Sequence, residues 1–124
     1  MENEITIWLE GHITPSLNKL LRKHWATRKR DRLALGKLIW YSFLMQNSRP
    51  DLDAPIILLR KCRLTISSYR KSLLDPDNFI GGLKEMVDVL KNIRLIYDDS
   101  PQYLDLVANQ HLSKNKKGTE IRIT

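Results

Sequence analysis

The sequence predicts a single α+β domain, residues 1–124, in which two main helices pack on one mixed β-sheet. Three observations predict it. The length of 124 residues is typical of one domain. Some segments alternate apolar and polar residues, as half-buried strands do, and two others repeat apolar residues at three- and four-residue steps, as amphipathic helices do. These segments follow the order β-α-β-α-β-β, which favours helices packed on a mixed sheet.

The first quarter of the chain predicts a strand, a loop and the start of a helix. Ile5, Ile7 and Leu9 alternate with more polar neighbours, so we expect a strand there, followed by a loop over 11–18. From 23 to 46 the pattern is helical, and the dense charge at its start allows the helix to begin only near Asp31. One face of this helix is expected to carry Leu35, Leu38, Ile39, Ser42 and Met45.

The middle of the chain predicts a turn, a strand and a loop. Two prolines mark a turn region at 47–55. A second strand is expected over 56–67, with Cys62, Leu64 and Ile66 on one side, followed by a loop over 68–76.

A second helix is expected to run to about Asn92, capped by Asp77 or Asn78. Its apolar stripe consists of Phe79, Leu83, Met86, Val87 and Leu90. Gly81-Gly82 in its first turn costs helix stability, about 1 kcal/mol per glycine. Such a cost indicates that a backbone or a ligand approaches closely there.

The rest of the chain predicts extended structure. A short extended segment is expected over 95–97, then strands over 103–112 and 119–124, joined by a turn over 114–118.

The composition is that of an ordinary folded protein, with 42% hydrophobic and 28% charged residues, which excludes collagen-like, low-complexity and disordered chains. A net charge of +7 and a pI near 9.7 suggest a polyanion partner. The one cysteine excludes an intrachain disulfide. No apolar run approaches the roughly 18 residues of a membrane span, and the acidic start of the chain is unlike a signal peptide. We therefore expect a cytoplasmic protein without a membrane partner.

Basic and acidic residues are segregated along the chain. The basic ones crowd the first third: Lys19, Arg22, Lys23, Arg28, Lys29, Arg30 and Arg32. The acidic ones crowd the region from 75 to 105: Asp75, Asp77, Asp88, Asp98, Asp99 and Asp105. A positive surface beside carboxylates is the layout of a metal-dependent nuclease, in which cations hold the phosphodiester backbone and carboxylates hold divalent ions. Taken alone, the charge distribution is more simply explained by solvated faces, because charge runs usually are such faces.

The segment Asp75-Pro76-Asp77-Asn78 strengthens the metal hypothesis. In an extended segment, residues two apart point the same way, so both carboxylates would face one ion. The intervening proline stiffens the loop. Mg²⁺ prefers oxygen ligands and keeps several waters, so two or three carboxylates suffice. A calcium loop of the EF-hand type is excluded, because Phe79 and Met86 occupy positions where oxygen ligands belong.

Two further groups follow in the sequence. Lys84 and Asp88 stand four apart on one helical face, where the lysine would stabilise charge on a phosphate or simply pair with Asp88. In Asp98-Asp99 adjacent side chains should diverge, so one of them is expected to face the ion; an ordinary polar turn is the alternative. His12, His24 and His111 lack metal-ligand spacing and are expected to be solvated or hydrogen-bonded. Trp25, beside the basic run, is the tryptophan considered for DNA contact.

The motifs Asp75-Pro76-Asp77-Asn78, Lys84, Asp88-Val89-Leu90 and Asp98-Asp99-Ser100-Pro101 together resemble the RusA family of Holliday junction resolvases. Pro15-Ser16-Leu17-Asn18, after the first strand, is similar to that family's early P-S-x-N loop. The likeness spans most of the chain in order. The stretch from Asn78 to Lys84 is longer than in the best-known members, a departure that affects the placement of Lys84.

The resemblance implies a homodimeric, Mg²⁺-dependent endonuclease, with Mn²⁺ as a possible substitute, that makes paired cuts in four-way DNA junctions. Asp75, Asp77 and Asp99 match the metal-binding carboxylates and Lys84 the catalytic lysine, while Asn78, Asp88 and Asp98 match supporting positions. The DNA-binding residues are expected to be exposed: Arg22, Lys23, Arg28, Lys29, Arg30 and Arg32. Two alternatives stay open, a DNA-binding module without catalysis and a nuclease for forks or flaps.

Overall fold

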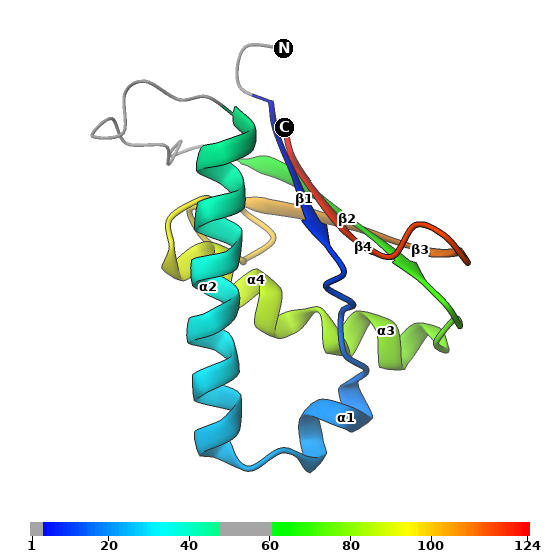
Figure 1. The fold of residues 1–124 in the computed structure, drawn as a ribbon. Coiled ribbons are helices and arrows are strands. Elements are labelled where there is room, and N and C mark those ends of the chain that lie inside the picture. Colours follow the sequence, from blue (N-terminus) through cyan, green and yellow to red (C-terminus); the bar gives the residue numbers. More distant parts are fainter. Residues whose placement is uncertain (1–3, 48–60) are drawn as a thin grey trace.

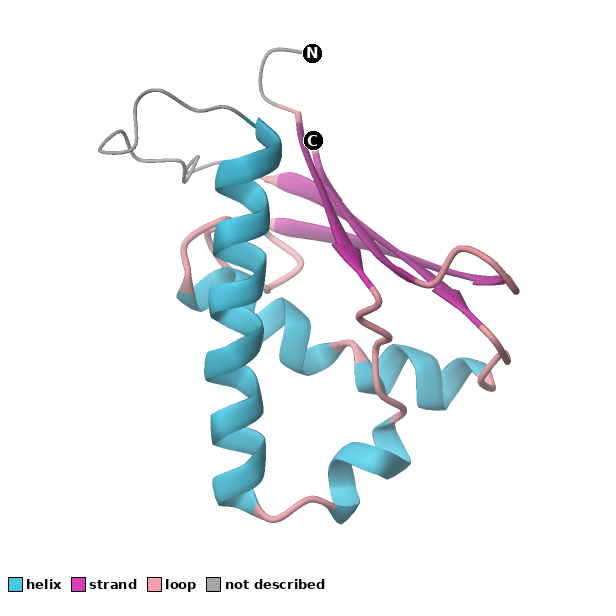
Figure 2. Ribbon diagram, viewed as in Figure 1, coloured by secondary structure: helices cyan, strands magenta, loops and turns pink. Residues whose placement is uncertain are grey.

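The computed structural model describes residues 4–47 and 61–124 and has the predicted α+β architecture, with helices packed on one mixed four-stranded sheet (Figures 1 and 2). Most of the turn expected at 47–55 and the start of the strand expected at 56–67 lie outside the described residues. The elements are β1 (Ile5–Glu10), α1 (Leu17–Arg22), α2 (Trp25–Asn47), β2 (Cys62–Arg70), α3 (Pro76–Gly82), α4 (Lys84–Asn92), β3 (Leu104–Leu112) and β4 (Gly118–Ile123).

The strands lie in the order β1-β4-β2-β3. β4 runs antiparallel to both of its neighbours, whereas β2 and β3 are parallel. Parallel strands need a crossover connection, and here α3 and α4 supply it. β4 does not pair with β3, although they are consecutive; it enters the sheet between β1 and β2. The two ends of the chain are thereby joined in the sheet.

The core lies between the sheet and the helices, which gather on one side of it (Figure 2). The sheet contributes Ile7, Leu64 and Ile121, and the helices contribute Ile39 and Phe43 of α2, all fully buried. The alternation in β1 is confirmed, because Ile5, Ile7 and Leu9 are buried. The stripe expected in the second helix is also confirmed: Phe79, Leu83, Met86, Val87 and Leu90 are all buried.

The buried face of α2 differs from the expected one. Ile39 is buried as predicted, but Leu38 and Met45 are exposed, and the buried face instead carries Gly36 and Phe43. α2 also begins at Trp25 and not near Asp31. Its charged first turns are tolerated because they lie away from the core and are partly neutralised by ion pairs.

Four local predictions are wrong. A short helix, α1, begins within the expected loop, capped by the Ser16 hydroxyl, which accepts a hydrogen bond from the Lys19 amide at 3.1 Å. β2 continues to Arg70, past the predicted end of the strand. The second helix is divided in two at Leu83. Residues 95–97 form bends, with Leu95 and Ile96 buried, rather than an extended segment.

The close approach expected at Gly81-Gly82 is confirmed. A Cβ atom on Gly82 would lie 1.8 Å from the carbonyl oxygen of Pro15, far inside any permitted contact. One on Gly81 would lie 2.8 Å from the Leu17 side chain. The glycines therefore let the chain before α1 pass directly against α3.

Candidate functional site

Asp75 caps the N-terminus of α3, a role that the sequence assigned to Asp77 or Asn78. Its Oδ2 accepts a hydrogen bond from the Asn78 amide at 3.2 Å, and its Oδ1 accepts one from the Asn78 side-chain amide at 2.7 Å. These bonds, the one from the Asn78 side chain first, lower the pKa of Asp75. Pro76 occupies the first helical turn, so Asp75 and Asp77 do not lie in an extended segment as the sequence predicted.

Asn78 connects this cap to the loop before α1. Its Oδ1 accepts a hydrogen bond from the Asn18 amide at 3.2 Å, while its amide nitrogen donates to Asp75. Together with the contact of Gly82 against Pro15, this bond joins the Pro15-Ser16-Leu17-Asn18 segment to α3. Two motifs about 60 residues apart in the sequence thus form one unit.

Lys84 and Asp99 line the same surface hollow. Its volume is about 450 Å³, and its walls come from α3, α4, the segment after α4 and β3. The rest of the lining is mainly apolar: Ile80, Gly81, Val87, Pro101, Leu104 and Leu106. Lys84 is the first residue of α4 and is exposed. The hollow therefore presents one cation and one carboxylate on an apolar wall, where charges interact more strongly than in open water.

Lys91 also belongs to this region, and the sequence analysis missed it. Its Nζ lies 3.2 Å from Asp98 Oδ1 and 3.8 Å from Asp99 Oδ1. This pairing raises the pKa of Lys91, chiefly through the hydrogen bond to Asp98. The pKa of Asp98 is lowered, first by the Asp99 backbone amide and then by Lys91. Both adjacent carboxylates therefore meet one lysine, contrary to the expectation that they diverge.

The predicted metal ligands lie at the start of α3 and on the hollow at its other end. Asp75 and Asp77 lie at the start of α3, whereas Lys84, beside Asp99, follows its end; seven helical residues span about 10 Å. Within residues 4–47 and 61–124, no three His, Cys, Asp or Glu side chains are grouped as metal ligands. The carboxylate oxygens of these residues are ligands of the kind that Mg²⁺ prefers. Asp88 is half-buried on α4.

The basic segment is only partly a free surface. Arg22, Lys29, Arg30 and Arg32 are exposed, as expected: they lie on α1 and the start of α2. Lys23 and Arg28 are half-buried in ion pairs, which corrects the prediction for both. Lys23 Nζ lies 2.7 Å from Asp31 Oδ2, and Arg28 Nε lies 2.9 Å from Glu85 Oε1. The Arg28–Glu85 pair ties α2 to α4.

Trp25 is 71% exposed at the start of α2, beside the basic residues, as a DNA contact requires. Its ring lies 5.5 Å from that of His24, at an interplanar angle of 34°. Trp8 and Tyr69 form a second aromatic group, on the sheet. Lys116 Nζ lies 4.8 Å from the centre of the Trp8 ring and 4.3 Å from the centre of the Tyr69 ring. Trp8 is therefore covered by a cation, and Trp25 is the more accessible ring.

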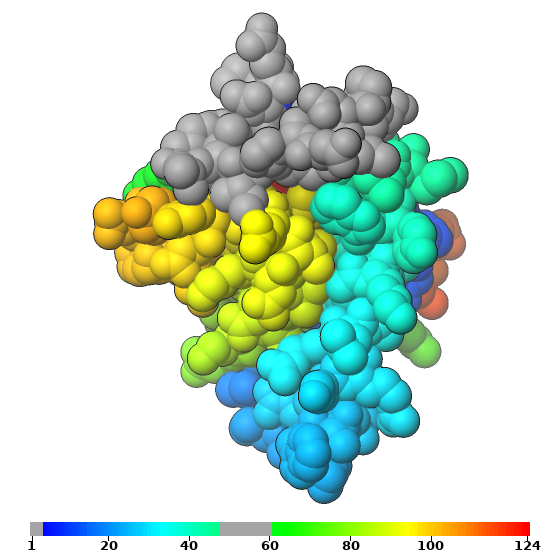
Figure 3. Space-filling model, turned by 90° about the vertical axis from the view of Figure 1, so that its left-hand side faces the viewer, coloured from blue at the N-terminus to red at the C-terminus, as the bar shows by residue number. Residues whose placement is uncertain are grey.

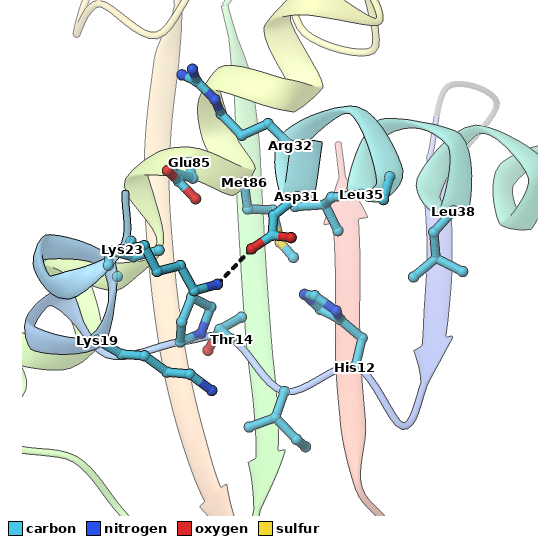
Figure 4. Close-up of a pocket in the computed structure, with 15 residues that line it drawn as sticks. His12, Thr14, Lys19, Lys23, Asp31, Arg32, Leu35, Leu38, Glu85 and Met86 are labelled. Carbon is cyan, nitrogen blue, oxygen red and sulfur yellow. Dashed lines mark hydrogen bonds and ion pairs between the residues drawn. The ribbon is translucent and has the colours of Figure 1, made fainter. Parts of the chain in front are cut away.

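A second cavity, of about 290 Å³, lies between the loop before α1, α2 and α4 (Figure 4). The Lys23–Asp31 ion pair crosses it, and the His12 ring faces that pair. His12 Nε2 is buried without a hydrogen-bond partner among the described residues, contrary to the solvated or bonded role expected for it. Burial lowers the pKa of His12, because desolvation disfavours the charged ring.

Comparison with known proteins leaves the family open. No model of a known protein family matches the sequence, and no curated protein is significantly similar to it. Among the helices of the described residues, none is long and apolar enough to cross a membrane.

Proposed function

We propose that this protein is a Mg²⁺-dependent endodeoxyribonuclease that acts on branched DNA as a homodimer. The supporting observation is the assembly of motifs from distant parts of the chain around α3 and α4. The Pro15–Asn18 loop bonds to Asn78, and Lys84 shares a hollow with Asp99. These contacts join segments that carry the resemblance to the RusA resolvases, and they support the proposal in that respect.

The residues of the site have distinct roles in this proposal. Lys84 binds a phosphate oxygen, and its positive charge stabilises negative charge that develops there during cleavage. Asp77 and Asp99 supply oxygen ligands for Mg²⁺, which would supply Lewis acidity and an activated water when bound. Asp75 and Asn78 act chiefly by fixing the start of α3. Arg22, Lys29, Arg30 and Arg32 bind the DNA backbone, because they are exposed.

The test is a cleavage assay on a labelled four-way junction, a fork, a flap and a linear duplex, with Mg²⁺, with Mn²⁺ and with chelator. We expect metal-dependent cleavage of the junction and little of the duplex. Asp77→Asn should abolish cleavage while retaining junction binding, and Lys84→Ala should reduce cleavage more than binding. Asp105→Asn and Lys114→Ala are the matched controls, since both residues are exposed outside the site. Wild-type cleavage by Asp77→Asn would refute the assignment.

A second candidate is a branched-DNA-binding protein without catalysis. Two observations favour it: no three His, Cys, Asp or Glu side chains of the described residues are grouped as metal ligands, and Asp75 already serves as a helix cap. It predicts tight junction binding and no product on any substrate with either metal. Cleavage of forks or flaps in preference to junctions would instead indicate a related nuclease with a different substrate.

A further inference from the structure

A groove of about 540 Å³ runs between α2 and α4, and it shares no lining residue with the hollow of Lys84 and Asp99. Figure 3 shows the face on which these two helices lie side by side. The floor of the groove is formed by Gly36, Val89 and Ile93, where α2 and α4 are in contact. Trp40 and Tyr41 form one end of its wall, and Tyr41 is 67% exposed. Leu33, 62% exposed, lies further along the same wall. The groove is therefore apolar and aromatic, yet open to solvent.

The rim of this groove is positively charged. Lys29, Arg32 and Lys37 line it, and among the described residues no Asp or Glu does. The exposed Arg30 continues the row of cations toward the start of α2. From Lys29 to Tyr41 the helix rises roughly 18 Å, which is long enough to lie along several nucleotides of a strand. The occupant must therefore offer both apolar faces and a line of negative charge.

We propose that this groove binds single-stranded DNA, with bases against Tyr41 and Trp40 and phosphates on Lys29, Arg32 and Lys37. Unpaired strands have both required features, because every base has an apolar face and every linkage a charge. In a duplex the base faces are stacked inside the helix, so Tyr41 and Trp40 would find no base face to stack on. An acidic amphipathic protein helix is the competing occupant. The row of exposed cations continues beyond the groove to Arg30. This favours single-stranded DNA over the acidic helix, because a DNA strand carries negative charge along a greater length.

Binding of a strand in this groove rests on the proposed function in one respect only, namely that the ligand is DNA. The groove residues are not among the predicted metal ligands, and binding in the groove requires no cleavage. Unpaired nucleotides occur wherever a branched DNA opens, so the groove would hold a strand beside the junction. Failure of the nuclease proposal leaves this one intact, and the reverse also holds.

The first test measures fluorescence anisotropy of a labelled 12-nucleotide oligo-dT and of a hairpin duplex of equal charge, in chelator to prevent cleavage. We expect Tyr41→Ala to weaken oligo-dT binding about five- to tenfold, from lost stacking, and to leave duplex binding unchanged. Leu112→Ala, at a side chain that is also 67% exposed but lies on β3, is the control. Replacing Lys29 and Lys37 by Ala should flatten the salt slope by about 0.7 per residue.

The second test uses Trp40 as a probe in a variant with Trp8→Phe and Trp25→Phe. Oligo-dT should quench its fluorescence, and Tyr41→Ala in the same background should reduce the quenching. Equal loss of oligo-dT and duplex affinity in Tyr41→Ala, or unchanged oligo-dT affinity, would overturn the proposal. It would also fail if oligo-dT left Trp40 unquenched while an acidic amphipathic peptide quenched it, because the groove would then be a protein-docking site.

Discussion

Gly82→Ala is the change for which the structure gives the sharpest prediction. The added Cβ would lie 1.8 Å from the Pro15 oxygen, whereas an ordinary carbon–oxygen contact is about 3.3 Å. The loop must therefore move by about 1.5 Å or α3 must shift. The loop is held by the Ser16 cap and by the bond from Asn18 to Asn78, so movement sacrifices these contacts.

The expected loss is a balance of two effects. Overpacking costs about 1–3 kcal/mol, and each sacrificed hydrogen bond adds about 1 kcal/mol. Alanine regains about 1 kcal/mol over glycine in a helix. We therefore expect Gly82→Ala to lower the free energy of unfolding by about 2–4 kcal/mol. Gly81→Ala should cost less, because the end of the Leu17 side chain is able to turn away.

Gly36→Ala is the matched control of opposite sign. Its Cβ would meet Ile93 Cγ2 at 3.5 Å and Val89 Cγ1 at 3.6 Å, which are ordinary contacts. It should raise the free energy of unfolding by about 0.5–1 kcal/mol. Urea unfolding followed by circular dichroism measures all three variants, with an unchanged m-value as the sign of a native-state effect. Equal stabilities of Gly82→Ala and Gly36→Ala would refute the close approach.

Three further predictions concern polar contacts. Asp75→Ala should destabilise the protein at pH 7 and Asp75→Asn should not, since asparagine also caps. Folding lowers the pKa of Asp75, so the ionised carboxylate adds to the free energy of unfolding above the ordinary aspartate pKa. This contribution is lost as the pH falls through the pKa of the folded state. The stabilities of wild type and Asp75→Ala should therefore become equal in acid unfolding. Arg28→Ala should lower the free energy of unfolding in urea by about 1–2 kcal/mol, because it leaves Glu85 unpaired. The exposed control, Arg30→Ala, should lower it by less than about 0.5 kcal/mol. Equal losses in the two variants would contradict a structural role for Arg28. Arg70→Met should cost about 2–4 kcal/mol in thermal unfolding, since this buried guanidinium bonds to Thr14, Ser68 and Ser72, and an unchanged midpoint would count against that role.

Features of the fold that depend on local pattern could be predicted from the sequence. The α+β class, the alternation of β1 and the apolar stripe across Phe79 to Leu90 each follow from the period of the apolar residues, and the structure confirms them. The cost of two consecutive glycines also indicated a close approach at Gly82. These features can be predicted from the sequence because side-chain periodicity and backbone sterics depend on only a few neighbouring residues.

Features that depend on long-range contacts were decided by the tertiary structure. The insertion of β4 between β1 and β2 and the pairing of Arg28 with Glu85 each join segments far apart in the sequence, and no local pattern shows that they meet. The candidate site shows the same division: the sequence alone singled out Lys84 and Asp99, but only the crossover between β2 and β3 placed them on one hollow. The physical reason is that chain direction and layer packing, which no local period encodes, determine which side chains meet.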